Sequence, residues 1–165
     1  MPVVYLGLGS NKGDRLKNIE VALNHLKKKI AVEKISSFYL TEPVGMKGEW
    51  FVNCVLKGKT EQPPEKLLDT LLQIETRMGR VRKKKKVSRL IDLDLLLYED
   101  AVVDKVDLAV PHPHLHKRRF VLTPLVEISP NLVHPVLGKS LKEILKELKN
   151  SHQVEKILEN RHGDH

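Results

Sequence analysis

Two aspartates, Asp92 and Asp94, are the most informative residues of the sequence, because they alternate with aliphatic residues. Alternate side chains of a β-strand project from the same face, so the two carboxylates are expected to point together. The neighbouring aliphatic side chains are then expected to face the core: Ile91, Leu93, Leu95 and Leu97. Two carboxylates about 7 Å apart on an apolar strand repel each other and lose hydration, and a shared divalent cation removes that cost. The pair therefore predicts a Mg²⁺ site, because Mg²⁺ usually takes one or two carboxylates together with substrate phosphates. A strand with a solvated acidic face is the alternative.

A dense run of cations lies just before these acids. Its members are Arg80, Arg82, Lys83, Lys84, Lys85, Lys86 and Arg89. Cations that converge with metal ligands are what phosphoryl or pyrophosphoryl transfer requires, because catalysis there is mostly positioning and charge neutralisation. The run alone is equally compatible with a solvated lysine loop, or with a targeting or nucleic-acid patch.

Three further features of the sequence are weaker indications of a functional site. The stretch from Gly7 to Gly13 lacks the spacing of a P-loop or a dinucleotide-binding motif, so we interpret it as a strand-to-helix turn. Cys54 lies in a predicted strand and is interpreted as a packed core residue rather than a nucleophile. Alternating histidines at 112, 114 and 116 could suggest zinc, but the prolines between them interrupt a strand and a fourth ligand is not evident. We expect His112 to contact a nucleotide instead.

The totals fit one globular domain, residues 1–165, with a polar tail from about residue 150 that we expect to be frayed. The chain is 41% hydrophobic and 30% charged, which excludes a disordered protein. Its start lacks the features of a signal peptide, and no stretch approaches the roughly 20 apolar residues of a membrane span. A cytoplasmic location is expected. The net charge of +8 favours anionic partners without choosing among nucleic acid, an acidic membrane surface and a polyphosphate substrate.

Hydrophobic periodicity predicts the elements that must position these residues. Strands are expected at Val3 to Gly9, Glu33 to Leu40, Phe51 to Lys59 and Ile91 to Tyr98. Helices are expected over Leu16 to Ile30, from Pro64 to Gly79, near Thr123 to Ile128 and over Ser140 to Leu148. This order predicts an α+β fold with a ferredoxin-like βαββαβ core: a largely antiparallel sheet with helices packed on one face, and extra C-terminal helices.

The segment Ser88-Arg89-Leu90-Ile91-Asp92-Leu93-Asp94-Leu95-Leu96 resembles the signature of the 6-hydroxymethyl-7,8-dihydropterin pyrophosphokinases (2-amino-4-hydroxy-6-hydroxymethyldihydropteridine diphosphokinases). Other blocks resemble that family in the same order, over roughly residues 3 to 135. They are Leu6 to Asn11, Ser36 to Tyr39 with Thr41 and Pro43, Phe51 to Asn53, Ile74-Glu75, Gly79 to Arg82, Val110 to Pro113, and Arg118 with Phe120.

The resemblance implies an ATP-dependent diphosphokinase of folate biosynthesis. The hydroxymethyl oxygen of the pterin would attack the β-phosphorus of ATP, and AMP would leave. Mg²⁺ is implied, with two ions expected, together with ATP as co-substrate. The expected partners are these small molecules only, with no nucleic acid and no membrane, and the enzyme is expected to be a monomer.

The resemblance also implies roles for individual residues. The implied catalytic residues are Arg82, Arg89, Asp92 and Asp94, of which Asp92 and Asp94 hold the metal. The implied ATP-binding residues are Glu75, Arg82, Lys83, Leu95, His112 and Arg118. The implied pterin-binding residues are Thr41, Val44, Phe51, Asn53, Asp92 and Phe120, with Phe120 stacking on the ring and polar groups supplying selectivity.

The chain departs from the signature at Val87-Ser88, where the family has Gly-Pro, and the basic loop is shorter than in some relatives. The roles of Lys83 to Lys86 are therefore not separated. Two other classes of protein are alternatives. A ferredoxin-like RNA-binding module would use the same element order, but aromatic residues make up only 4% of the chain and an acid pair would repel a phosphate backbone. A structural scaffold would bind no ligand.

Overall fold

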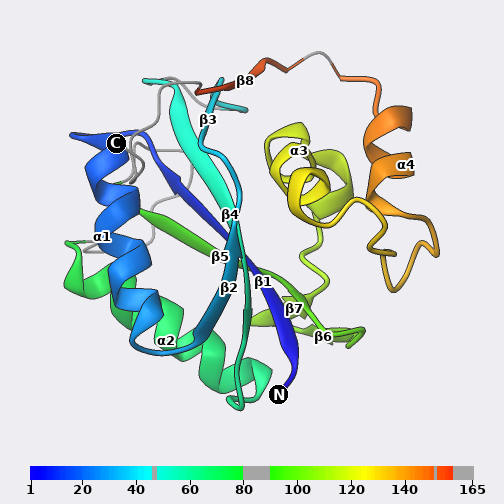
Figure 1. Ribbon diagram of the computed structural model, residues 1–165, viewed down its shortest axis with the longest axis horizontal. Helices are drawn as coiled ribbons and strands as arrows, with labels where there is room; N and C mark the ends of the chain where they lie inside the picture. Colours follow the sequence, from blue (N-terminus) through cyan, green and yellow to red (C-terminus); the bar gives the residue numbers. More distant parts are fainter. Residues whose placement is uncertain (46–47, 80–89, 151, 158–165) are drawn as a thin grey trace.

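A computed structural model describes residues 1–45, 48–79, 90–150 and 152–157. The chain begins with the predicted order of strand, helix, two strand segments, strand, helix and strand, and continues into a hairpin and two more helices (Figure 1). The strands are β1 (Val3–Ser10), β2 (Ala31–Ile35), β3 (Tyr39–Thr41), β4 (Phe51–Lys59), β5 (Asp92–Tyr98), β6 (Val103–Lys105), β7 (Leu108–Val110) and β8 (Val154–Lys156). The helices are α1 (Arg15–Lys27), α2 (Pro64–Arg77), α3 (Arg119–Ile128) and α4 (Leu141–Glu147), with a 3-10 turn η1 (Leu115–Lys117).

The main sheet has the order β5-β1-β4-β3-β8, and β2 pairs with the other end of β4. Every pairing in it is antiparallel, which confirms the predicted ferredoxin-like α+β fold. The strand expected over Glu33 to Leu40 is divided into β2 and β3, which follow one another along the same edge of β4. At the break, the backbone N–H of Val55 donates to the Ser36 hydroxyl and that of Ser36 donates to the Val55 carbonyl, so β4 keeps a partner there.

The ends of the first two helices are set by individual residues at their termini. The Asp14 carboxylate caps α1 by accepting from the backbone N–H of Lys17 at 3.1 Å. Pro64 occupies the first turn of α2, where its missing N–H costs nothing, as predicted. Gly79 follows α2 with φ of 104°, a left-handed conformation that ends helices and that glycine adopts without strain.

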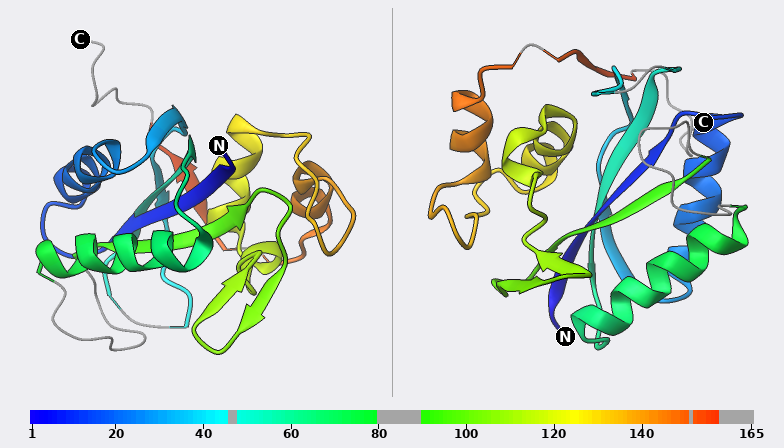
Figure 2. Two further views of the ribbon diagram at one scale, coloured as in Figure 1. Left: turned by 90° about the horizontal axis from the view of Figure 1, so that it is seen from below. Right: turned by 180° about the vertical axis from the view of Figure 1, so that it is seen from behind.

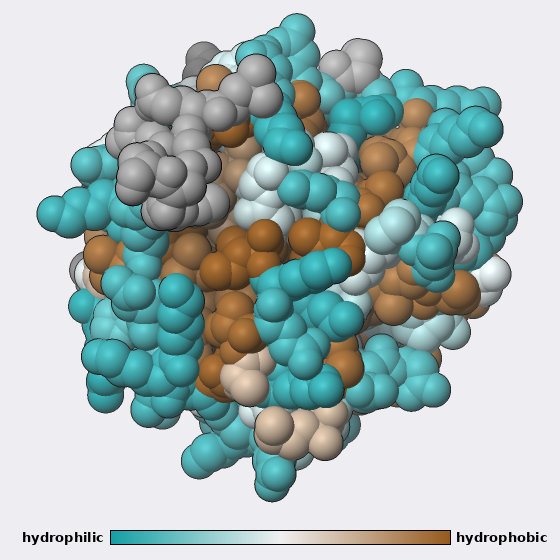
Figure 3. Space-filling model, in the orientation of Figure 1, coloured by the Kyte–Doolittle hydropathy of each residue, from teal (hydrophilic) through white to brown (hydrophobic). Residues whose placement is uncertain are grey.

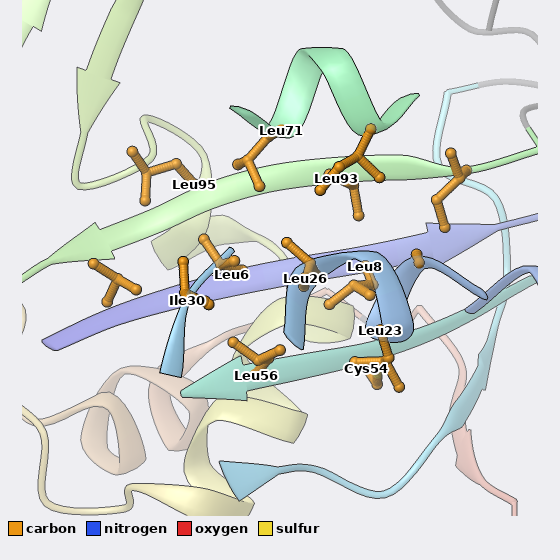
Figure 4. Close-up of a cluster of buried hydrophobic side chains, with 14 of the residues drawn as sticks. Leu6, Leu8, Leu23, Leu26, Ile30, Cys54, Leu56, Leu71, Leu93 and Leu95 are labelled. Carbon is orange, nitrogen blue, oxygen red and sulfur yellow. The ribbon is translucent and has the colours of Figure 1, made fainter. Parts of the chain in front are cut away.

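Helices cover both faces of the sheet, so the expectation that they pack on one face was incomplete. Helices α1 and α2 lie on one side, while α3 and α4 lie on the other (Figures 1 and 2). The core beneath α1 and α2 is largely aliphatic and includes Leu6, Leu8, Leu93 and Leu95 from the strands (Figure 4). A second cluster beneath α3 and α4 includes Tyr5, Leu96 and Leu97. Neighbouring residues of β1, such as Tyr5 and Leu6, are therefore buried against different helices.

Two elements were not predicted. Strands β6 and β7 form a hairpin between β5 and the histidine-containing loop. The tail, expected to be frayed, adds β8 to the free edge of β3, because its backbone supplies the hydrogen bonds that an edge strand lacks.

In the space-filling view, hydrophilic side chains cover most of the face shown and apolar surface gathers toward its centre (Figure 3). No helix in the described part of the chain has the length and apolarity needed to cross a membrane.

Candidate active site

The acid pair lies where strand β5 borders β1. Asp92 pairs with Gly9 and Asp94 with Gly7, so each carboxylate has a residue without a side chain beside it in the sheet. Leu93 lies between them and is buried against α1 and α2, as the alternation predicted. The two carboxylates therefore share the opposite face, where glycines leave room for a ligand.

The alternation fails after Leu95. Leu6 pairs with Leu95 and Tyr5 pairs with Leu97, so Leu96 is an extra residue, a β-bulge. Leu96 and Leu97 consequently both belong to the cluster beneath α3 and α4. The prediction that Leu97 faces the same core as Leu93 and Leu95 was wrong, because a bulge changes which face the following residues occupy.

A cleft of about 210 Å³ opens on the face that carries the acids. Strands β1, β3, β4 and β5 and the start of α3 contribute to its lining. Eight of the predicted site residues line this cleft: Thr41, Val44, Phe51, Asn53, Asp92, Asp94, Arg118 and Phe120. The structure thus brings together, in one hollow, residues that are separated by up to about 80 positions in the sequence.

The polar wall of the cleft is built by β3 and β4. Thr41 and Asn53 are almost fully buried, and the Asn53 Nδ2 atom donates to the Thr41 Oγ1 atom at 2.5 Å. Elsewhere in the lining, the guanidinium carbon of Arg118 lies 5.6 Å from the centre of the Phe120 ring, within the range of a cation–π contact. The cleft therefore combines a hydrogen-bonding wall with an aromatic ring, a combination suited to a flat polar heterocycle.

Two predicted nucleotide-binding residues lie on the other side of β5. Glu75 projects from α2 and is 2% exposed, and its carboxylate accepts from the backbone N–H of Leu93 at 2.7 Å. The Leu95 side chain is buried in the core. Neither residue lines the cleft. Their contacts with ATP stay predictions.

His112 lies beside the cleft without lining it, and its backbone N–H donates to the Leu96 carbonyl at 2.9 Å. Burial lowers the pKa of His112 to about 4, with the charge of Arg118 and the neighbouring His114 adding to the effect. Its Nδ1 atom accepts from the backbone N–H of His114 at 3.1 Å, so the ring proton is on Nε2. His112 is therefore a neutral donor near neutral pH.

Four of the described histidines lie in two ring pairs. The rings of His112 and His114 are 5.9 Å apart, while His116 meets His134 edge-on at 6.0 Å. Among the residues that the structure describes, no group of three or more His, Cys, Asp or Glu side chains is placed to hold a metal ion. Two carboxylates still suit Mg²⁺, because that ion takes most of its ligands from water and phosphate.

Arg82 and Arg89, which were predicted to neutralise the triphosphate, and Lys83, which was predicted to bind ATP, lie outside the described residues. Cys54 is 1% exposed, and burial raises the pKa of its thiol, so its interpretation as a core residue agrees with its environment. It also borders the cleft.

Sequence reasoning missed the residues that shape the cleft without bearing obvious chemistry. Gly7 and Gly9 form its floor, and Glu42 lines it next to Thr41. Asn11 and Arg15 donate to the carbonyls of Glu49 and Trp50, at 3.3 and 2.6 Å, and so hold the end of the loop that leads into β4. Glycines at alternate positions of a strand that abuts two acids were the available signal for the floor.

Comparison with known proteins gives the following. The family model described as 7,8-dihydro-6-hydroxymethylpterin-pyrophosphokinase matches residues 5–130. A 2-amino-4-hydroxy-6-hydroxymethyldihydropteridine pyrophosphokinase of Aquifex aeolicus is 45% identical over 148 residues, covering 89% of this chain and 92% of that protein. The protein of the same name from Methylorubrum extorquens is 40% identical over 151 residues, covering 90% of this chain and 94% of that protein.

Some relatives are much longer. A folic acid synthesis protein of Schizosaccharomyces pombe is 43% identical over 88% of this chain, which spans only 20% of that protein. Among solved structures, the HPPK-DHPS protein of Plasmodium falciparum superimposes with a TM-score of 0.72 at 17% identity, over 89% of this chain and 43% of that one. That likeness supports the fold.

Proposed function

The chain belongs to the 7,8-dihydro-6-hydroxymethylpterin-pyrophosphokinase family, and on this premise we propose that the cleft between β1, β3, β4, β5 and α3 is its active site. The enzyme transfers pyrophosphate from ATP to 6-hydroxymethyl-7,8-dihydropterin, a step of folate synthesis. In this transfer the hydroxymethyl oxygen forms a bond to the β-phosphorus, the bond from that phosphorus to the α–β bridging oxygen breaks, and AMP leaves. The hydroxyl proton passes to solvent or to a base.

The observation that carries this proposal is the position of Asp92 and Asp94. Both carboxylates line the cleft, beside glycines that leave space, on a strand whose alternate residues are buried in the core. Such a pair would hold Mg²⁺, with two ions expected. When bound, the metal neutralises phosphate charge and orients the polyphosphate chain.

The nucleotide would lie on the side of the cleft that Arg118 lines, near His112. Arg118 supplies a permanent cation, and His112 presents a neutral Nε2–H donor. Neutrality suits a residue that binds a phosphate oxygen through one directional hydrogen bond without adding charge. Arg82, Lys83 and Arg89 would complete the cationic side, with Glu75 and the Leu95 backbone on the adenosine side.

The pterin would lie over the glycine floor of β1. Thr41 and Asn53 offer hydrogen bonds to its polar edge, and Phe51 and Phe120 offer aromatic surface to its ring. Val44, which is 44% exposed, stands at the margin of the cleft and would be covered by the ring. Asp92 would approach the hydroxymethyl group because it lies across Gly9 from Asn53. A monomer in the cytoplasm with no nucleic-acid partner remains the expectation from the sequence.

The test is the identity of the nucleotide product. Purified protein supplied with MgATP and 6-hydroxymethyl-7,8-dihydropterin should release AMP in a one-to-one ratio with the pterin pyrophosphate ester, measured by ion-exchange chromatography. Release of ADP would mean that the γ-phosphoryl group is transferred instead. The Asp92→Asn variant should reduce the rate of AMP release at least a hundredfold, while its circular dichroism spectrum stays that of the folded parent. AMP release at the parent rate from that variant would remove Asp92 from the site.

A further inference from the structure

The floor of the cleft is formed by three neighbouring strands. Gly9 of β1 pairs with Asn53 of β4 on one side and with Asp92 of β5 on the other. The proposed pterin-binding amide and the proposed metal ligand thus flank a position that has no side chain. Gly9 has an ordinary extended strand conformation, so the backbone does not require glycine there. The reason for glycine must lie in what surrounds it.

The Asn53 side chain fills the space above Gly9. A Cβ atom at position 9 would lie 2.5 Å from the Asn53 Oδ1 atom, well inside van der Waals contact. The nearest other atom, in the Phe51 ring, would be 3.5 Å away, which is an ordinary contact. A methyl group at position 9 therefore conflicts with one atom, and that atom belongs to the amide that borders the cleft.

Thr41 holds the same amide from the other end. The Asn53 Nδ2 atom donates to the Thr41 Oγ1 atom at 2.5 Å, and both residues are at most 8% exposed. The amide cannot move away from Gly9 without losing or bending that bond. Among the described residues, no protein donor reaches the Oδ1 atom, and Asn53 lines the cleft, so this oxygen is available to accept a hydrogen bond from a ligand N–H.

We infer that Gly9 is a positioning residue for substrate selectivity: its missing side chain lets the Asn53 amide lie with Nδ2 on Thr41 and Oδ1 toward the cleft. The site then presents a fixed acceptor to a ring N–H or exocyclic amine of the heterocycle. A displaced amide leaves a ligand N–H without its acceptor, and unpaired polar groups in such a site are costly. This inference rests on the proposed pterin site and goes beyond it by assigning a role to Gly9.

Gly9→Ala should therefore weaken pterin binding while sparing nucleotide binding and the fold. The dissociation constant for 6-hydroxymethylpterin, measured by calorimetry in the presence of Mg²⁺ and α,β-methylene-ATP, should rise at least tenfold. The dissociation constant for α,β-methylene-ATP alone should change less than twofold. In steady state, the KM for the dihydropterin should rise more than kcat falls. Equal pterin binding by Gly9→Ala and the parent would overturn the inference.

Gly7→Ala is the matched comparison, because it places a methyl group on the same strand face, 3.5 Å from the Leu96 side chain and away from Asn53. Its effect on pterin affinity should be at least fivefold smaller than that of Gly9→Ala. Equal losses in the two variants would mean that any added methyl obstructs the cleft, and the role of Gly9 through Asn53 would be refuted.

A double-mutant cycle separates this inference from the proposed function. Asn53→Ala should itself weaken pterin binding; if it does not, the proposed pterin site fails and the role of Gly9 fails with it. If Asn53→Ala weakens binding, adding Gly9→Ala to it should cost less than twofold more, because the displaced amide is already gone. Additive losses would show that the methyl obstructs the ligand directly, which contradicts the inference.

Thr41 provides an independent route should Gly9→Ala not fold. Thr41→Val removes the acceptor of the Asn53 amide without adding volume, and Thr41→Ser restores it. Pterin affinity should fall at least fivefold in Thr41→Val and recover to within about twofold of the parent in Thr41→Ser. Equal affinities in the two variants would show that the Thr41 hydroxyl does not hold the amide, and the inference would fall.

Discussion

The two faces of the sheet differ in how completely they are covered. On one face, α1 and α2 lie over a largely aliphatic core. On the other, α3 and α4 cover a second cluster, and the cleft lies beside it. Strand β1 shows the difference within four residues, because Leu6 and Leu8 belong to the first core while Gly7 and Gly9 form the cleft floor.

In this arrangement, the side chains that stabilise the fold and those that line the cleft lie on opposite faces of the same strands. Burial of the leucine face fixes the register of β1 and β5, because a shift by one residue would exchange the two faces. The register in turn fixes where the glycines and the acids lie. Substitutions on the leucine face should therefore affect the free energy of unfolding, and substitutions on the cleft face should affect turnover.

The largest effect on the leucine face is expected from Leu6→Ala. Leu6 is fully buried, so the variant loses transfer free energy and leaves a cavity, at a cost of about 2–5 kcal/mol in the free energy of unfolding. Urea titration measures this loss, and kcat per folded molecule should stay near that of the parent. Val106→Ala, at the exposed tip of the β6–β7 hairpin, is the control and should change stability by less than about 0.5 kcal/mol. Equal losses in the two variants would contradict the comparison.

On the cleft face, Asp92→Asn and Asp94→Asn should each reduce kcat at least a hundredfold, about 2.7 kcal/mol of barrier. Each removes a charge proposed to hold the metal that offsets the triphosphate, while the core stays intact. Neither variant should lose stability, measured by thermal unfolding. Asp104→Asn in β6 is the control for a change of acid to amide and should retain turnover. A kcat close to that of the parent in both cleft variants would instead support the alternative that Asp92 and Asp94 form a solvated acidic face without a metal.

An intermediate effect is expected from the tail. Glu42 lines the cleft, its backbone N–H donates to the Gln153 carbonyl, and its carboxylate accepts from the Gln153 N–H at 2.7 Å. Truncation after Asn150 should lower the free energy of unfolding by about 1–3 kcal/mol, because several edge hydrogen bonds of β3 are lost. The KM for the pterin should rise several-fold as Glu42 loses its anchor. A truncation after Ile157, which keeps β8, should match the parent in both measurements.

The smallest effect expected is a contribution of His112 to the pH dependence of stability. Its pKa is about 4 in the folded protein and near 6.5 when unfolded, so between these values the unfolded chain binds a proton that the folded chain does not. Its contribution is complete above about pH 6.5 and is lost as the pH falls toward 4. His112→Gln should therefore lose less stability than the parent between pH 7 and pH 4.5 in urea titrations. Identical slopes in the two proteins would place the titration elsewhere.

Much of the fold could be predicted because its signals are local. Prolines before α2, the capping Asp14 and the left-handed Gly79 set helix ends through their own backbones. The faces used by the C-terminal helices could not be predicted, because the strands are apolar on both sides and periodicity does not say which helix covers which side. The strand β8 escaped notice because its exposed residues gain stability from pairing with β3 rather than from burial.

The candidate site was predicted where a residue's chemistry is evident from its type. Asp92, Asn53 and Phe120 fall into one cleft although the sequence separates them. Gly9 was missed because its contribution is the absence of a side chain, and only the position of the Asn53 amide shows what that absence permits. Glu75 shows a related limit, since its carboxylate bonds the backbone between the two acids from the opposite side of the strand.

The bulge at Leu96 has a consequence for how the chain tolerates changes in length. Because Leu96 and Leu97 share one face, losing Leu96 leaves every other residue of β5 on the side it occupies now. Losing Leu95 has the same outcome, because Leu96 then takes its place, whereas losing Leu93 or Asp94 would shift the parity and turn an acid toward the leucine core or a leucine toward the cleft. Insertions and deletions in homologous strands should therefore be found most often at this bulge, where β5 has one residue more than its partner β1.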